Sequence, residues 1–203
     1  MTKRALAEQI HRILYPKSTK DVKTDLREII AVVGELADSL RLAAVYDMMK
    51  MEEYDMLGDF LTYYDEVDIA FDEQRNQFYS TLPAQPLGLP KNMGIWNVSY
   101  QNDEANAFLP ATSNYVPLYS GLQSFTSKRV VYRPLRDKIY YSNIVNTDAK
   151  VALTLIASAE SIDERDVINC PTTFFPQIIQ GAVEIYKLQK GITEDVLNNE
   201  VSE

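Results

Sequence analysis

The first pattern along the chain is a helical spacing of apolar residues near the N-terminus. Leu6, Ile10, Ile13 and Leu14 are three, four or seven residues apart, and Thr2 precedes them as a candidate N-cap. The pattern predicts an amphipathic helix over residues 2–14, which the proline and polar residues that follow would end.

A second and longer apolar stripe starts after Thr24. Its members recur at helical spacing over about five turns, whereas most charged residues of the segment lie off the stripe. We expect a helix from about 24 to 56. The stripe comprises Leu26, Ile29, Ile30, Val33, Leu36, Ala37, Leu40, Ala43 and Ala44.

The last part of this predicted helix is apolar but imperfectly periodic. It contains Met48, Met49, Met51, Tyr54 and Met56. Methionine is flexible and fills irregular gaps, so the stretch could line a contact with another protein. Alternatively, the end of the helix packs under a loop of its own chain.

The period changes from helical to alternating in the middle of the chain. Val67, Ile69 and Phe71 alternate with other residues, the polar run DEQRN follows, and QFYSTL alternates again, which predicts a β-hairpin. GIWNVSY predicts a strand with Trp96, Val98 and Tyr100 on one face.

Two further segments complete the predicted β-rich middle. VVYRPLRDKIYYSNI indicates two strands around a Pro-Leu-Arg-Asp turn. VALTLIAS, residues 151–158, is the most apolar strand candidate, so we expect it at the centre of its sheet.

A helical pattern returns near the C-terminus and predicts a helix over about 173–190, with Pro176 suited to its first turn. The fold class predicted for the chain is therefore α+β. We expect a single domain over 1–203, with a helical part (1–60 and 160–203) and a β-rich elaboration (61–159). The apolar positions of the last helix are Phe175, Ile178, Ile179, Ala182, Val183 and Tyr186.

Residues 82–90, LPAQPLGLP, form a segment rich in proline, which we call the proline segment. Proline lacks an amide donor and fixes φ, so the segment is expected to run extended and to be no interior strand. It would connect two parts of the sheet or lie on an adjacent subunit. Its candidate contact residues are Leu82, Pro83, Pro86, Leu87, Leu89 and Pro90.

A long stretch without clear periodicity, residues 101–127, separates two predicted strands. Loops longer than about 12–15 residues in compact domains are usually functional or disordered, and the tyrosines and leucines here favour an ordered docking loop. The alternative is a loop folded back over its own sheet. The candidate contact residues are Phe108, Leu109, Tyr115 and Tyr119.

The net charge of −9 disfavours general binding to nucleic acid or to anionic membranes. One basic cluster runs against this trend, and because it alternates with apolar residues it is typical of the solvated face of a strand pair, with phosphate contact as the alternative. Its members are Lys128, Arg129, Arg133, Arg136 and Lys138.

The sequence offers little for catalysis. His11 and Cys170 are the only residues of their types, which argues against a histidine-dependent triad, a zinc site or an internal disulfide, and indicates a reducing compartment. We expect His11 on the surface of the first helix. No glycine-rich phosphate motif, apolar membrane span or secretion signal is recognisable, so we expect no cofactor, metal or membrane association.

Five carboxylates between residues 65 and 73 are dense enough to consider a cation site or an acid–base pair. On one strand, Glu66, Asp68 and Asp72 would share a face. The polar side of an amphipathic hairpin explains the same residues, and we favour it. We therefore expect no catalytic residues and no enzyme. The five are Asp65, Glu66, Asp68, Asp72 and Glu73.

Three stretches give the chain a resemblance to a known group of proteins. MTKRALAEQIHRILY, LREIIAVVGELADSL and FYSTLPAQPLGLPKNMGIWNVSY resemble virion proteins of tailed bacteriophages, above all the ring, or head-to-tail connector, proteins of crAss-like podoviruses.

The resemblance implies a structural subunit that assembles as a cyclic, dodecameric ring between portal and tail. The implied partners are further copies of the chain, the portal and other neck or tail proteins, with at most non-specific proximity to DNA in the channel. The implied location is the neck or tail of the virion, after synthesis in the bacterial cytoplasm.

Two rival functions stay open at the level of sequence. One is a non-enzymatic scaffold or binding module that acts as a monomer or dimer outside any ring. The other is a carboxylate-dependent hydrolase that would act through Asp68 and Asp72.

Overall fold

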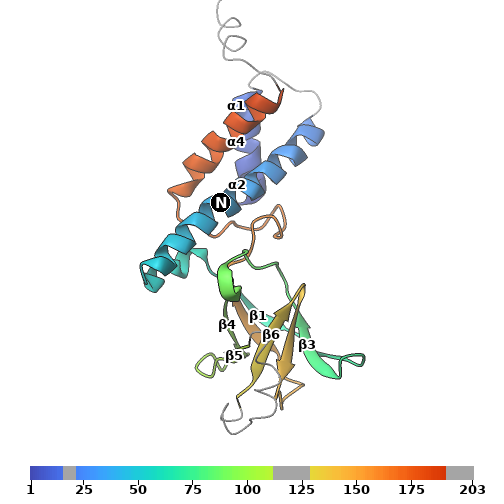
Figure 1. Cartoon of the computed structure of the whole chain (residues 1–203). Coiled ribbons are helices and arrows are strands. Elements are labelled where there is room, and N and C mark those ends of the chain that lie inside the picture. The colour runs from blue at the N-terminus through green and yellow to red at the C-terminus, as the bar shows by residue number, and fades with distance from the viewer. Residues whose placement is uncertain (16–21, 112–128, 191–203) are drawn as a thin grey trace, which may run out of the picture. The chain divides into compact units, whose positions relative to one another are not determined.

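The structure is a computed structural model that describes residues 1–15, 22–111 and 129–190, and it is α+β as the sequence predicts (Figure 1). The chain divides into two compact units, Met1–Phe60 with Ser158–Glu203 (unit 1) and Leu61–Ala157 (unit 2). Unit 2 is thus inserted in the sequence of unit 1. The expected division, at 60/61 and 159/160, differs from the observed one by two residues at its second boundary.

Unit 1 is built on three α-helices, α1 (Lys3–Leu14), α2 (Val22–Lys50) and α4 (Phe174–Lys190). Thr2 caps α1 as predicted, because its hydroxyl accepts a hydrogen bond from the Ala5 amide at 3.2 Å. The two other predicted helices are also present.

The predicted extension of the second helix to residue 56 is wrong, because α2 ends at Lys50. Glu52 adopts a left-handed φ of 61°, the Glu53 amide donates to the Met48 carbonyl at 2.9 Å, and the Glu52 amide donates to Met49 at 3.3 Å. This Schellman arrangement satisfies the last carbonyls of the helix and turns the chain away. The chain continues in a short 3₁₀ helix, η1 (Tyr54–Phe60), which contacts α2.

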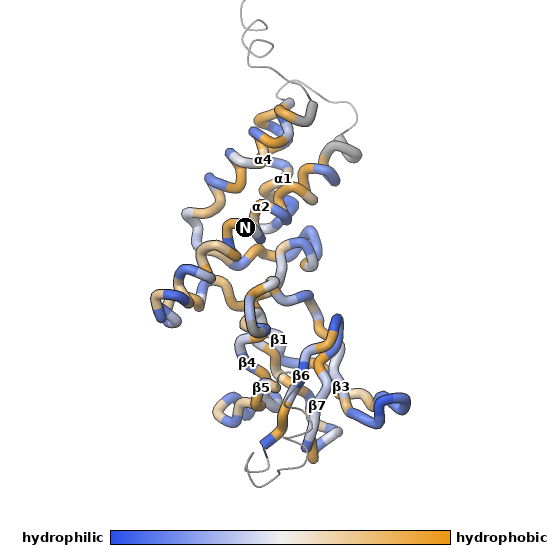
Figure 2. Tube along the Cα trace, viewed as in Figure 1, coloured by the Kyte–Doolittle hydropathy of each residue, from blue (hydrophilic) through white to orange (hydrophobic). Residues whose placement is uncertain are grey.

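The core of unit 1 lies where the three helices meet. Each helix turns its apolar stripe inward, so hydrophobic and hydrophilic positions alternate along its length (Figure 2). Burial of these side chains is the main stabilising term for the bundle. Fully buried members include Leu6, Ile10, Ile29, Val33, Ile178 and Tyr186.

Unit 2 contains two sheets. The smaller sheet has the order β1 (Thr62–Val67), β8 (Val151–Leu155) and β4 (Ile95–Tyr100). The central position predicted for VALTLIAS is confirmed, and its strand is almost entirely buried. The pairing is antiparallel on both sides of β8.

The larger sheet has the order β2-β3-β7-β6-β5. The predicted hairpins are both present, one between β2 and β3 and one between β6 and β7, where Arg136 takes a φ of 57° in the turn. The strands are β2 (Ala70–Asp72), β3 (Gln77–Thr81), β7 (Lys138–Ser142), β6 (Val131–Leu135) and β5 (Leu109–Pro110).

The shared face predicted for Trp96, Val98 and Tyr100 is wrong for Trp96, whereas Val98 and Tyr100 both pack in the core of unit 2. The register of β4 against β8 shifts between Ile95 and Asn97, and such a bulge moves the residues before it to the other face. Ile95 and Val98 are therefore both buried, whereas Trp96 is 40% exposed.

Residues from both sheets contribute to a single core in unit 2. Val98, Val151 and Leu153 come from the smaller sheet, and Ile139 and Tyr141 come from the larger one. Two sheets that bury their inner faces against each other form a sandwich.

Candidate functional site

The proline segment lies on its own unit. The Leu82 amide donates to the Asp137 carbonyl at 2.8 Å, the Leu87 amide donates to Ile156 at 2.7 Å, and Pro86 forms a bridge with Ala157. As predicted, the segment is not an interior strand, because it makes single backbone hydrogen bonds and one isolated bridge and lacks the continuous ladder of a strand. It then enters a short 3₁₀ turn, η2 (Pro90–Asn92).

Gly94 permits the close approach of this segment to the start of β4. A Cβ at position 94 would lie 2.5 Å from the Leu87 carbonyl oxygen and 2.9 Å from Cβ of Pro86. Both distances are too short for a side chain, so this position requires glycine unless the segment moves.

The burial of the proline segment corrects part of the predicted contact set. Leu82, Leu87 and Leu89 are only 6–7% exposed, and Leu82 belongs to the core of unit 2. They are therefore not available to an adjacent subunit. Pro83 and Pro90 are exposed and Pro86 is half-buried, so the contact predicted for the prolines stays a prediction.

The described part of the long loop folds back on its own sheet. Phe108 is 5% exposed, and its ring lies 4.9 Å from that of Tyr100 and 5.9 Å from that of Tyr141. Leu109 begins β5, which pairs in parallel with β6. The predicted docking role of Phe108 is thus wrong, and that of half-buried Leu109 stays a prediction. Tyr115 and Tyr119 lie outside the described residues.

The irregular end of the second predicted helix is exposed in part, since Met51, Tyr54 and Met56 are exposed and Met48 and Met49 are half-buried. These three exposed residues and the exposed Leu42 and Tyr46 lie on the C-terminal part of α2, on the turn after it and on η1, and we call the five the methionine surface. Their exposure argues against packing under a loop, and a contact with another protein stays a prediction. The members and their exposed fractions are Leu42 (39%), Tyr46 (53%), Met51 (67%), Tyr54 (45%) and Met56 (59%).

A second surface feature of unit 1 is an open groove between α1 and α4, with a volume of about 530 Å³. We call it the α1–α4 groove. Ile13 is 48% exposed at its edge, although the sequence places this residue on the apolar stripe of the helix. The groove is lined by Gln9, Ile13, Pro176, Ile179, Gln180, Val183, Glu184 and Lys187.

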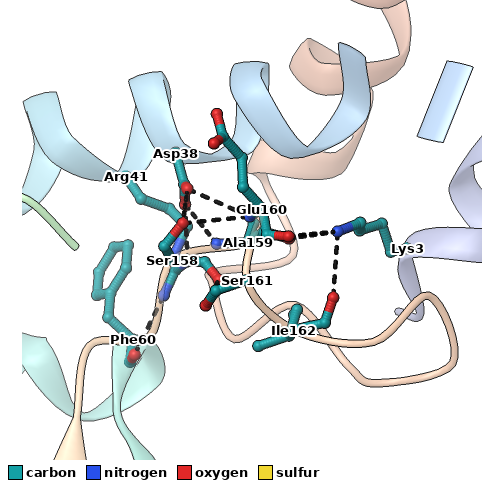
Figure 3. A network of polar contacts seen from close by, with 9 residues as sticks. All are labelled: Lys3, Asp38, Arg41, Phe60, Ser158, Ala159, Glu160, Ser161 and Ile162. Atoms are coloured by element: carbon teal, nitrogen blue, oxygen red, sulfur yellow. Dashed lines mark hydrogen bonds and ion pairs between the residues drawn. The ribbon is translucent and has the colours of Figure 1, made fainter. Parts of the chain in front are cut away.

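A polar network holds the start of the returning chain, residues 158–162, against the helices of unit 1 (Figure 3). Asp38 on α2 accepts hydrogen bonds from the Ala159 amide at 2.7 Å and the Ser158 hydroxyl at 2.5 Å. Lys3 on α1 donates to the Ala159 carbonyl at 2.6 Å and the Ile162 carbonyl at 3.2 Å. A carboxylate thus satisfies the amides of this segment, and an ammonium satisfies its carbonyls.

Arg41 extends this network into the interior. Its guanidinium is 1% exposed, pairs with Asp38 at 3.3 Å and donates to the Phe60 carbonyl at 3.4 Å. Burial lowers the pKa of Arg41, whereas the Asp38 carboxylate acts in the opposite direction. Burial also raises the pKa of the nearby Cys170 thiol, despite the opposing charge of Arg41, so this cysteine is not activated as a nucleophile.

The carboxylates of residues 65–73 do not form one site. The chain leaves the smaller sheet after Val67 and enters the larger sheet at Ala70, so Glu66 and Asp72 belong to different sheets and the predicted shared face is wrong. Glu66 pairs with Lys150 at 2.6 Å. Asp72 caps the β2–β3 turn by accepting from the Gln74 and Arg75 amides, and from the Tyr140 hydroxyl at 3.0 Å.

His11 is not the surface residue that the sequence predicts. Its side chain is only 9% exposed, and its ring lies 5.1 Å from that of Tyr15. In the basic cluster, the Lys138 ammonium lies 4.0 Å from the centroid of the Tyr79 ring, and Arg136 is exposed. This arrangement is typical of the solvated strand face that we favoured.

Among residues 1–15, 22–111 and 129–190, no group of three or more histidine, cysteine or acidic residues is placed to hold a metal ion. Within the same ranges, every helix is too short or too polar to cross a membrane. The surfaces that remain as candidate functional features are the methionine surface and the α1–α4 groove.

Comparison of the sequence with known proteins does not identify a family for this chain. A scan against models of protein families finds no match, and a search of curated proteins finds none either.

Neither the groove nor the polar network was found by sequence reasoning. Both bring the N-terminal 41 residues together with residues beyond 157. The spacing of hydrophobic residues within one helix or strand does not show which distant elements lie side by side. Two signals were available: Ile13 lies at the edge of its helical stripe, and Asp38 and Arg41 are charged residues beside an apolar stripe.

Proposed function

We propose that the protein is a structural virion component that assembles as a cyclic ring, expected to be dodecameric, in the neck between portal and tail of a tailed bacteriophage. The role is non-enzymatic. The partners are further copies of the chain, the portal and other neck or tail proteins, and the ring is incorporated in the virion after synthesis of the chain in the host cytoplasm.

The methionine surface carries the assembly part of this proposal. Five large apolar side chains, each at least 39% exposed, lie between residues 42 and 56, on the last part of α2, on the turn after it and on the 3₁₀ helix that contacts α2. Clustered apolar surface is rare on monomers and is typical of contacts with other proteins, in which methionine and tyrosine are enriched.

The phage part rests on the resemblance of residues 1–15, 24–42 and 78–100 to connector proteins. The chain's own chemistry is compatible with this role, because the polar groups in unit 1 and in the carboxylate cluster are used to hold the fold. A net charge of −9 would also repel DNA from the wall of a channel.

Cryo-electron microscopy of purified virions tests the proposal. We expect density that fits this chain in rotationally repeated copies below the portal, in a fixed copy number per particle. If the protein is absent from virions and purifies as a monomer or dimer, the proposal fails in favour of a scaffold or binding module outside the ring.

A further inference from the structure

The α1–α4 groove is lined by side chains of both helices along their length. Gln9 and Ile13 are one helical turn apart on α1, and Ile179, Val183 and Lys187 follow one face of α4, so the groove runs along two helices. Its volume of about 530 Å³ is in the range of pockets that enclose ligands of about 300–1,000 Å³. An amphipathic helix could therefore place several side chains in it.

The C-terminal part of α2 has the form that such a groove accepts. Leu42, Tyr46 and Met49 stand four and three residues apart, so they follow one face of the helix. This spacing is the one by which helices anchor in apolar grooves. Leu42 and Tyr46 are exposed, and Met49 is half-buried beside them.

Charge distinguishes the two surfaces. Five carboxylates and one lysine are exposed on or beside the methionine surface, which gives it a net charge of −4; they are Asp47, Lys50, Glu52, Glu53, Asp55 and Asp59. The lining of the groove is neutral, with Lys187 against Glu184; beside it, Arg12 is exposed and Glu8 is paired with Arg4.

These charges decide how two copies of the chain can meet. Two methionine surfaces facing each other would bring −4 against −4, and like charges at an interface oppose association. The methionine surface against the groove instead brings −4 against a neutral lining with the exposed Arg12 beside it. The contact is then between two different faces of the subunit, and such heterologous contacts generate rings when the rotation closes.

We propose that the methionine surface of one copy docks in the α1–α4 groove of the next copy. The inference rests on the proposed function for its biological setting, but the contact itself belongs to the free chain and is measurable without a virion. Tyr46 is its central aromatic anchor, and Ile13 and Val183 line the site that it enters.

Disulfide trapping between two variants of the full chain tests the contact. Both variants carry Cys170→Ser; one adds Ile13→Cys and the other adds Tyr46→Cys. In an equal mixture at high protein concentration, we expect a disulfide between the two variants to form at least about tenfold faster than in the control mixture, because a docked pair holds the thiols in reach. The control replaces Tyr46→Cys by Arg27→Cys, an exposed position on the same helix.

Each result of the trapping experiment either supports or overturns the proposed contact. Equal rates in test and control mixtures overturn the proposal, as does faster joining of the Tyr46→Cys variant to itself, which would indicate a symmetric pair. A different protein as the natural occupant of the groove would also give equal rates. When the Ile13→Cys variant also carries Arg12→Glu and Lys187→Glu, we expect the disulfide to form more slowly, because the methionine surface of the other variant is negatively charged.

The two proposals can fail separately. Rings in virions without the trapped contact would keep the proposed function and reject these surfaces. A trapped contact with no copies in virions would keep the surfaces and reject the location.

Discussion

Asp38 is the residue on which the returning chain of unit 1 depends. It neutralises a guanidinium that is 1% exposed and accepts hydrogen bonds from residues 158–160. Removing one partner of a buried ion pair leaves the other charge uncompensated in a medium that solvates it poorly.

We therefore expect Asp38→Ala to lower the free energy of unfolding by about 3–5 kcal/mol. Asp47→Ala, an exposed position on the same helix, should change it by no more than about 0.5 kcal/mol. Urea denaturation of both variants measures the difference. Equal losses would mean that the network does not stabilise the fold.

Tyr132 gives unit 2 a sensitivity to alkaline pH. Burial raises the pKa of Tyr132 from 10.0 to about 12, because the fold disfavours the phenolate. Below pH 10 the phenol is protonated in both states, so stability is unaffected there. As the pH rises from 10 to about 12, only the unfolded chain loses the proton, and stability falls.

The expected loss from Tyr132 by pH 11.5 is about 2 kcal/mol, since this pH lies about 1.5 units above the unfolded pKa and each unit corresponds to about 1.4 kcal/mol. Tyr132→Phe should reduce the dependence by that amount, measured as the difference in denaturant midpoint between pH 9 and pH 11.5. An unchanged dependence in the variant would assign the alkaline loss to other groups. The pKa of Tyr141 is also raised by burial, so part of the loss should persist.

At the scale of elements, the contact between the proline segment and β4 depends on the absence of one side chain. Gly94→Ala would place Cβ 2.5 Å from the Leu87 carbonyl oxygen, so the backbone must shift. We expect a loss of about 1–3 kcal/mol, as for other overpacked sites.

Gly88→Ala in the same segment is the matched control, because a Cβ there meets nothing within 4 Å. We expect almost no loss of stability from it, and thermal unfolding of the two variants compares them directly. If both alanines are tolerated equally, the segment is looser than the structure indicates.

The elements themselves could be read from the sequence wherever one face is buried. The periodic stripe at 26–44 and the apolar run at 151–155 gave a helix and a central strand, because packing rewards those periods. The two wrong predictions, the end of the second helix and the shared face of β4, come from local changes in the backbone that hydrophobic periodicity does not reveal. These changes are the left-handed Glu52 that ends α2 and the register shift before Asn97 that exposes Trp96.

The candidate site was harder to predict than the fold. The apolar character of the methionine stretch identified a possible contact, but the same character in Leu82, Leu87 and Phe108 reflects burial in unit 2. The sequence shows that a residue is hydrophobic, but it does not show whether that residue is buried in the fold or exposed on its surface. The α1–α4 groove depends on a pairing of helices at opposite ends of the chain, which only the fold reveals.

At the scale of the whole molecule, the chain has two cores, one in the helices and one between the sheets. No buried residue of the described part belongs to both clusters. Domains with separate cores can unfold separately.

We therefore expect Asp38→Ala to accelerate hydrogen exchange in α2 but not in β7 and β8, and Gly94→Ala to do the reverse. Exchange measured by mass spectrometry on peptides from these elements distinguishes the two patterns. Faster exchange of both units in both variants would show that they unfold as one cooperative body.

The insertion of unit 2 also sets an order of events during synthesis. The ribosome completes α1 at residue 14 and begins α4 at residue 174, which at about 5–20 residues per second separates them by roughly 8–32 s. Throughout that interval α1 and α2 lack the third helix, and the groove has only one wall. No nascent chain therefore offers this groove to a neighbour on the same messenger RNA before its own α4 has been made.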